Sequence, residues 1–185
     1  DRIGRGDVGN GVAIRENLRR LTDGALSRCV RIFATEDVPA PVDTGSADLP
    51  PGSREILKIH ETRVVGALRV GGNGGKPLEL DRALEAPQVI CEKRGPDPFE
   101  NPAFRRLLAA LPAAVPVVYG VGTTHAVSGA CKGLFAIGRR PILVVDAVGW
   151  QAPAAREEAI EGLRRLGVNE ATTEQVIDSL DGHDL

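Results

Sequence analysis

Apolar residues at helical spacing predict a series of helices along the chain. In the first, over residues 12–27, apolar side chains recur every three or four positions: Ile14, Leu18, Leu21 and Ala25. A second helix begins at Pro102, behind the capping residue Asn101. Further helices are predicted over 125–137, which Gly138 closes, over 154–166, before Gly167, and from Thr172 or Thr173 to Leu180.

Short runs of β-branched and apolar residues between these helices predict strands. They cover residues 29–34, 63–70, 87–93, 115–121, 141–145 and 168–171. Strands that alternate with helices at this spacing form a mostly parallel sheet that helices cover on both faces. The predicted fold is therefore α/β, a three-layer, doubly wound, Rossmann-like sheet. We expect a single domain over residues 1–185, with loops or frayed ends at 1–13 and 181–185.

Two segments are predicted to be irregular. Residues 38–53 contain four prolines, which favours a long surface loop. The glycine-rich run at 71–77 invites comparison with a phosphate-binding loop, but Val70 and Pro77 stand where that motif needs a glycine and a Ser or Thr. We therefore interpret this run as a flexible turn.

Composition narrows the possible partners. The formal net charge is −2 and aromatic residues make up 3% of the chain, so neither a basic stripe for nucleic acid nor a base-stacking surface is expected. No segment is long and apolar enough to span a bilayer, and no signal peptide is visible. Cys29, Cys91 and Cys131 lie in apolar segments and are interpreted as small buried side chains. We expect a cytoplasmic protein that binds a small molecule.

Candidate chemistry gathers where the predicted strands end. Asp37, Lys93 and Asp146 each follow a strand, and the turn GVGTTHA joins a strand to a helix. The first amides of a helix are unpaired donors suited to an oxyanion or a phosphate, and Gly122 permits close backbone approach. His125 stands where a dinucleotide fingerprint needs its third glycine, so no nucleotide cofactor is expected.

From about residue 14 to residue 177 the chain resembles the isochorismatase-like cysteine hydrolases, in particular their nicotinamidase-like branch. The resemblance lies in four stretches: IRENLRRLT with IFATED, ICEKRGPDPFENPAF, VVYGVGTTHAVSGACKGL, and RPILVVDAVG with ATTEQVI. It implies hydrolysis of a C–N bond in a small metabolite by a homo-oligomer, a dimer or a tetramer. In this family a cysteine at a helix start attacks the amide carbonyl, activated by a lysine and an aspartate.

The resemblance also implies roles for individual residues. The catalytic lysine corresponds to Lys93, and the nucleophile position to Ala126. The backbone amides of Gly122 and Ala126 would hold the oxyanion after a cis peptide bond between Val121 and Gly122. The expected substrate pocket is made of five residues: Asp37, Phe99, Thr123, His125 and Trp150. Lys93 as a solvated charge, Asp146 as a helix cap and Trp150 as a surface cover remain alternative interpretations.

The chain departs from the family at its nucleophile and its aspartate. Alanine cannot attack, so either a cysteine has been changed to Ala126 or the protein does not work as a cysteine amidase. Cys131 is five residues further on, about 140° around the helix, and is a poor substitute. The aspartate normally ends a first strand, and no apolar strand precedes Ile14. We expect that it lies before Asp1 or has been lost, unless Asp1 or Asp7 replaces it; without that strand, a gap would separate two neighbouring strands.

The metal site of nicotinamidases is not expected here. Val38 and Pro39 follow Asp37 where the family places Asp-x-His, which leaves His60 as a lone candidate ligand, so neither metal nor cofactor is predicted. Three hypotheses remain: an amidohydrolase without its nucleophile, a non-catalytic relative that acts as a metabolite-binding, structural or regulatory subunit, and a vinyl-ether hydrolase like the isochorismatases. The last depends on the aspartate that is not found.

Overall fold

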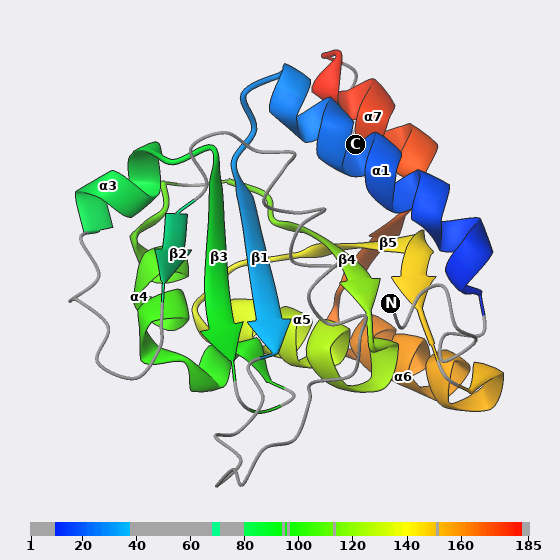
Figure 1. Cartoon of the computed structure of the whole chain (residues 1–185). Coiled ribbons are helices and arrows are strands. Elements are labelled where there is room, and N and C mark those ends of the chain that lie inside the picture. Colours follow the sequence, from blue (N-terminus) through cyan, green and yellow to red (C-terminus); the bar gives the residue numbers. More distant parts are fainter. Residues whose placement is uncertain are drawn as a thin grey trace, which may run out of the picture.

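The computed structural model describes residues 10–37, 68–70, 80–93, 95, 97–112, 114–150 and 152–182 (Figure 1). The strands are β1 (Ile32–Asp37), β2 (Leu68–Val70), β3 (Gln88–Lys93), β4 (Val117–Val121), β5 (Ile142–Gly149) and β6 (Asn169–Ala171). The helices are α1 (Gly11–Ser27), α3 (Leu80–Glu85), α4 (Pro102–Ala110), α5 (Ser128–Ala136), α6 (Pro153–Leu166) and α7 (Thr173–Leu180). Two short turns complete the set, the 3-10 turn η1 (Pro98–Glu100) and the π-helical turn η2 (Thr123–Val127).

Most predicted helices are confirmed. Their ends could be predicted because a few adjacent side chains define them. The Asn101 side-chain oxygen accepts hydrogen bonds from two amides in the first turn of α4. Thr172 and Gln175 form a capping box at the start of α7. Gly167 ends α6 with a left-handed φ of 89°, a conformation that glycine adopts at little cost.

The parallel strands form two three-stranded sheets, where the sequence predicts one. Their orders are β1-β3-β2 and β4-β5-β6. Within the described residues, β1 and β4 each carry an edge with no strand partner. The gap expected in the absence of the family's first strand stays a prediction, because residues 1–9 lie outside the described structure. Figure 1 shows β1, β3, β4 and β5 all pointing toward the same side of the molecule.

Helices cover both faces of the second sheet. One face carries a buried cluster that includes two residues of α6: Val127, Cys131, Leu143, Ile160 and Leu163. On the other face a second cluster joins α1 to α7 through β5: Leu21, Ile142, Val144, Ala147, Ala171 and Val176. A third cluster joins β3 and α4 to Leu134 of α5, so α5 packs against both sheets. The predicted three-layer α/β architecture is confirmed.

β5 runs past its predicted end at residue 145 and continues to Gly149. Its register against β4 shifts: Val118 pairs with Leu143, but Gly120 pairs with Val148. Side chains bind two of the backbone carbonyls in this irregular stretch. Asn17 Nδ2 donates to the Asp146 carbonyl at 2.8 Å, and an Arg156 guanidinium nitrogen donates to the Val145 carbonyl at 3.1 Å. The sequence does not reveal this irregularity because it depends on residues far along the chain.

The Asp146 side chain acts as a cap for α7. Its Oδ1 accepts hydrogen bonds from the Thr173 amide at 2.8 Å and from Thr173 Oγ1 at 2.9 Å. Thr173 is 1% exposed, so losing the acceptor would leave buried donors without a partner. The alternative interpretation of Asp146 as a cap is the one the geometry supports.

We expect Asp146→Ala to destabilise the protein by about 1–2 kcal/mol, because two hydrogen bonds to α7 are lost. Asp146→Asn keeps the Oδ1 acceptor and should cost less than half as much. Urea unfolding followed by circular dichroism measures both variants. Equal losses for Ala and Asn would contradict the capping role.

The remaining differences are local. β1 begins at Ile32 rather than at residue 29, because the Val30 amide still bonds to the Ala25 carbonyl and Cys29 has a φ of 56°. Cys29 is exposed, so its predicted burial is wrong, whereas Cys91 and Cys131 are buried as predicted. The short elements α3 and η1 are missed by the sequence patterns. The predicted loop at 38–53 and turn at 71–77 lie outside the described residues.

Candidate active site

The carboxyl ends of the strands carry most of the predicted site. In the first sheet Asp37 pairs in register with Lys93, at the ends of β1 and β3. In the second sheet Val121 pairs with Gly149, at the ends of β4 and β5. Figure 1 shows β3, which ends at Lys93, and β4, which leads into the turn, pointing toward the same side of the molecule.

Lys93 is buried, with 7% of its surface exposed. Its Nζ donates a hydrogen bond to the Gly95 carbonyl at 3.1 Å. A buried ammonium group is costly unless polar partners surround it, so this position does not suit a solvated surface charge. The structure therefore favours Lys93 as a buried, hydrogen-bonded side chain over the alternative of a solvated surface charge.

Two glycines with positive φ lie near the end of β4 and directly after it. Gly120 has a φ of 132° and Gly122 a φ of 86°, conformations that side chains rarely tolerate. The chain then enters η2, a single π-helical turn, before α5 begins. Such π-helical turns often occur at functional sites. The predicted cis bond between Val121 and Gly122 is wrong: the bond is trans, and the two glycines make the turn without it.

The Gly149 carbonyl anchors this turn. It accepts the Gly122 amide at 3.1 Å and Thr123 Oγ1 at 2.8 Å. Thr123 is fully buried, and its own carbonyl accepts Ser128 Oγ at 2.8 Å. Thr123 is therefore a structural link rather than an exposed pocket residue. The Gly122 amide already donates to the Gly149 carbonyl and is therefore not free to hold an oxyanion in this arrangement. Of the two predicted oxyanion donors, the Ala126 amide stays a prediction.

No nucleophile replaces the missing cysteine among the described residues around Ala126. Burial raises the pKa of the Cys131 thiol to about 12, and this side chain packs in the cluster with Leu143 and Leu163. A thiol in such surroundings stays protonated and unreactive. Ser128 is buried and engaged with the Thr123 carbonyl. His125 is exposed, with its Nδ1 2.8 Å from Thr124 Oγ1.

Phe99 and Trp150, both predicted for the pocket, occupy different environments. Phe99 is 4% exposed and packs edge-on against Phe104, with ring centroids 5.4 Å apart. Trp150 is half-buried just after β5, and the Arg156 guanidinium lies 4.6 Å from its ring centroid. Phe99 is thus a core residue here, whereas Trp150 remains beside the candidate site. The side chain of Asp37 lies outside the described structure.

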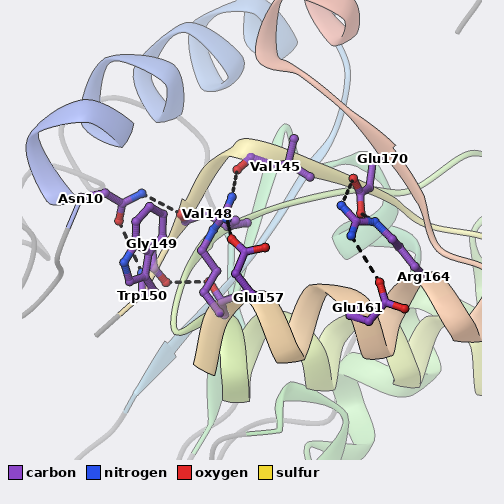
Figure 2. A network of polar contacts seen from close by, with 11 residues as sticks. Asn10, Val145, Val148, Gly149, Trp150, Glu157, Glu161, Arg164 and Glu170 are labelled. Carbon is purple, nitrogen blue, oxygen red and sulfur yellow. Dashed lines mark hydrogen bonds and ion pairs between the residues drawn. The ribbon is translucent and has the colours of Figure 1, made fainter. Parts of the chain in front are cut away.

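Sequence reasoning missed Asn10 and Arg156. Figure 2 shows Asn10 in a network at the end of β5, where it binds the backbone at Val148 and Trp150. Arg156 covers Trp150 and bonds to the Val145 carbonyl, while its Nε is buried with no hydrogen-bond partner among the described atoms. An Asn before a helix is usually assigned as its cap, so the sequence offers no signal of this long-range role.

The Isochorismatase domain family model matches residues 3–175. The chain belongs to the isochorismatase family. No curated protein sequence matches it at a significant level. The match covers Lys93, the turn and α6, and it ends within the first turn of α7, so it includes every described element that forms the candidate site.

Solved structures share the fold of this isochorismatase family domain. The MAR1 ribonuclease from Caenorhabditis elegans is 20% identical, with a TM-score of 0.62 over 96% of this chain and 74% of that one. Nicotinamidase PncA from Bacillus subtilis is 17% identical, with a TM-score of 0.60 over 87% and 85%. N-carbamoylsarcosine amidase from Thermoplasma acidophilum is 16% identical, with a TM-score of 0.56 over 88% and 83%. At these identities the likeness is one of fold.

The described part of the domain contains no metal-like cluster of three His, Cys, Asp or Glu side chains. His60, the lone candidate ligand, and the carboxylates Asp1 and Asp7 lie outside it. Helices capable of crossing a membrane are likewise not found among the described residues.

Proposed function

We propose that this domain is a hydrolase of C–N bonds in a small amide metabolite, in a form whose nucleophile position is occupied by Ala126. The observation that supports this best is that the buried Lys93 ends β3 and the glycine-shaped turn follows β4, two strands that point toward the same side of the molecule (Figure 1). The family match and the amidase neighbours support the same reaction class.

The proposed reaction needs a thiolate at position 126. The sulfur would bond to the amide carbonyl carbon, the C–N bond would break, and the amine would leave with a proton. Water would then release the acid and return the thiol. Alanine has no lone pair to donate, so the chain with Ala126 would bind the amide without cleaving it covalently. Lys93 would favour the thiolate through its positive charge.

A second candidate is a non-catalytic relative that binds a metabolite or acts as a structural or regulatory subunit. Two observations favour it: Ala126 itself, and the engagement of the Gly122 amide by the Gly149 carbonyl. The two candidates differ in a single measurable property, whether a thiol placed at position 126 reacts with a bound amide.

We expect Ala126→Cys to hydrolyse at least one amide in a panel of small amides that includes nicotinamide. Release of ammonia or amine should exceed that of the unmodified chain by about 10²-fold or more, because the turn and Lys93 would activate the new thiol. Ammonia and amine are measured by a coupled assay or by mass spectrometry. Binding to the unmodified chain is followed by the emission of Trp150, the single tryptophan of the sequence.

Ala130→Cys is the matched control, since it places a half-buried thiol on α5 one turn beyond position 126. It should bind the same amides and cleave none. A folded Ala126→Cys variant that binds an amide but shows no turnover would rule out the hydrolase and favour the non-catalytic relative. Absence of binding to any panel member would count against both.

We further propose a homo-oligomer, a dimer or tetramer, in the cytoplasm, with no nucleic-acid or membrane partner. A structural neighbour from Escherichia coli, 16% identical with a TM-score of 0.58, is described as an octameric hydrolase of unknown specificity, which supports assembly. The net charge of −2 offers little attraction to nucleic acid, and the three cysteines are free thiols, as expected in a reducing compartment.

A further inference from the structure

Asn10 stands at the capping position of α1 but does not cap the helix. Its side chain makes no hydrogen bond to the α1 backbone, although asparagine is among the best capping residues. Instead, Nδ2 donates to the Val148 carbonyl at 3.0 Å, and Oδ1 accepts the Trp150 amide at 3.4 Å. Figure 2 shows the carboxamide reaching the end of β5. Asn10 thus bonds to residues about 140 positions away in place of a local cap.

The carboxamide of Asn10 imitates one residue of a neighbouring parallel strand. In a parallel ladder a residue bonds to the carbonyl before and the amide after the residue it faces, which is the pattern of Val148 and Trp150 around Gly149. The described β6 pairs only with residues Ile142, Leu143 and Val144 of β5. Asn10 therefore satisfies backbone groups of β5 beyond the end of β6.

Gly149, the residue held between these two bonds, is the residue that anchors the turn. Its carbonyl accepts both the Gly122 amide and Thr123 Oγ1. The Gly122 carbonyl in turn accepts the amides of His125 and Val127, which flank Ala126. A continuous set of hydrogen bonds thus runs from Asn10 through the end of β5 to the turn around position 126.

We propose that Asn10 is a positioning residue for this turn. It fixes the peptides on both sides of Gly149, and the Gly149 carbonyl then fixes Gly122, whose own carbonyl holds the two amides that flank position 126. This inference rests on the proposed function, because it takes that turn as the reactive centre. Its consequence is that Asn10 tunes the reactivity of a group at position 126 without touching it.

The test measures the pKa of a thiol at position 126 in the Cys29→Ser/Ala126→Cys double variant. Cys29→Ser removes the exposed native thiol, while burial raises the pKa of Cys91 and of Cys131 to about 12 and keeps both silent. The rate of alkylation by iodoacetamide is followed from about pH 5 to about pH 10, on either side of an ordinary thiol pKa. Adding Asn10→Ser, which places another residue that favours helix starts at this position but cannot reach β5, should raise the midpoint by about one pH unit.

Asn17→Ser in the same background is the matched control. Asn17 also extends from α1 to a carbonyl of β5, that of Asp146, but it does not flank Gly149. It should lower the melting temperature to a similar extent and leave both the alkylation midpoint and the Trp150 emission unchanged. Asn10→Ser should shift both.

Equal alkylation midpoints in the Asn10 and Asn17 variants would overturn the inference. A midpoint of about 8.5 in the parent double variant, the value of an ordinary thiol, would overturn it as well. Because alkylation needs no substrate, failure of the proposed function is seen separately, as a reactive thiol in a protein that neither binds nor cleaves amides.

Discussion

Replacing Gly133 with alanine should destabilise the protein by about 2 kcal/mol, although alanine is the better helix former. A Cβ built on Gly133 of α5 would lie under 3.0 Å from three carbons of the Phe99 ring, closer than real Cβ atoms approach. That ring is buried and has little room to move. Overpacking of this kind costs about 1–3 kcal/mol or more, which exceeds the gain of about 1 kcal/mol in helix propensity. Thermal unfolding should show a melting temperature lower by roughly 4–8 °C.

Gly162→Ala provides the matched control for Gly133→Ala. Gly162 also lies inside a helix, α6, but it is exposed, and a Cβ added there would meet nothing within 4 Å. Only the propensity effect applies there, so this variant should gain about 0.5–1 kcal/mol in stability. The opposite signs at two helical glycines are the decisive result. A gain at both sites would mean that α5 does not pack against Phe99 as described.

Gly133 and Gly162 differ only in what packs against them in the fold, and this contrast shows which features a sequence can predict. Helix ends such as those at Asn101 and Gly167 depend on a few adjacent residues, and they are predicted correctly. The division of the sheet, the irregular path of β5 and the role of Asn10 depend on partners far along the chain. A local sequence pattern does not reveal these distant partners.

The candidate site shows the same limit. The resemblance to a known family directed attention to Lys93 and to Ala126 from sequence alone, because residue identity at a matched position is visible there. Whether an amide is free to bind an oxyanion is not visible: Gly122 donates to Gly149, a pairing that arises only when β4 and β5 come together in the fold. Phe99 lies at the expected spacing after Lys93, but sequence spacing could not distinguish a ring that lines a pocket from one that fills the core.

Phe99→Ala should therefore act on stability, with an expected loss of about 3–5 kcal/mol. The ring is 4% exposed, packs edge-on against Phe104 and fills the space that Gly133 leaves on α5. Phe99→Leu, which retains much of the apolar volume, should lose markedly less. Urea unfolding measures the free energy of each variant, and Trp150 emission measures amide binding. A pocket-lining role predicts the reverse pattern, with weakened binding and little change in stability.

The double variant Phe99→Ala/Gly133→Ala tests the contact itself. With the ring removed, the new methyl group enters vacated space, so Gly133→Ala should become neutral or stabilising by up to about 1 kcal/mol. The coupling energy between the two positions should then be about 2–3 kcal/mol, within the range for residues in direct contact. Simple additivity of the two losses would contradict the contact. Strong coupling would establish that the Phe99 ring holds the segment after Lys93 against Gly133 of α5, the helix that follows the turn.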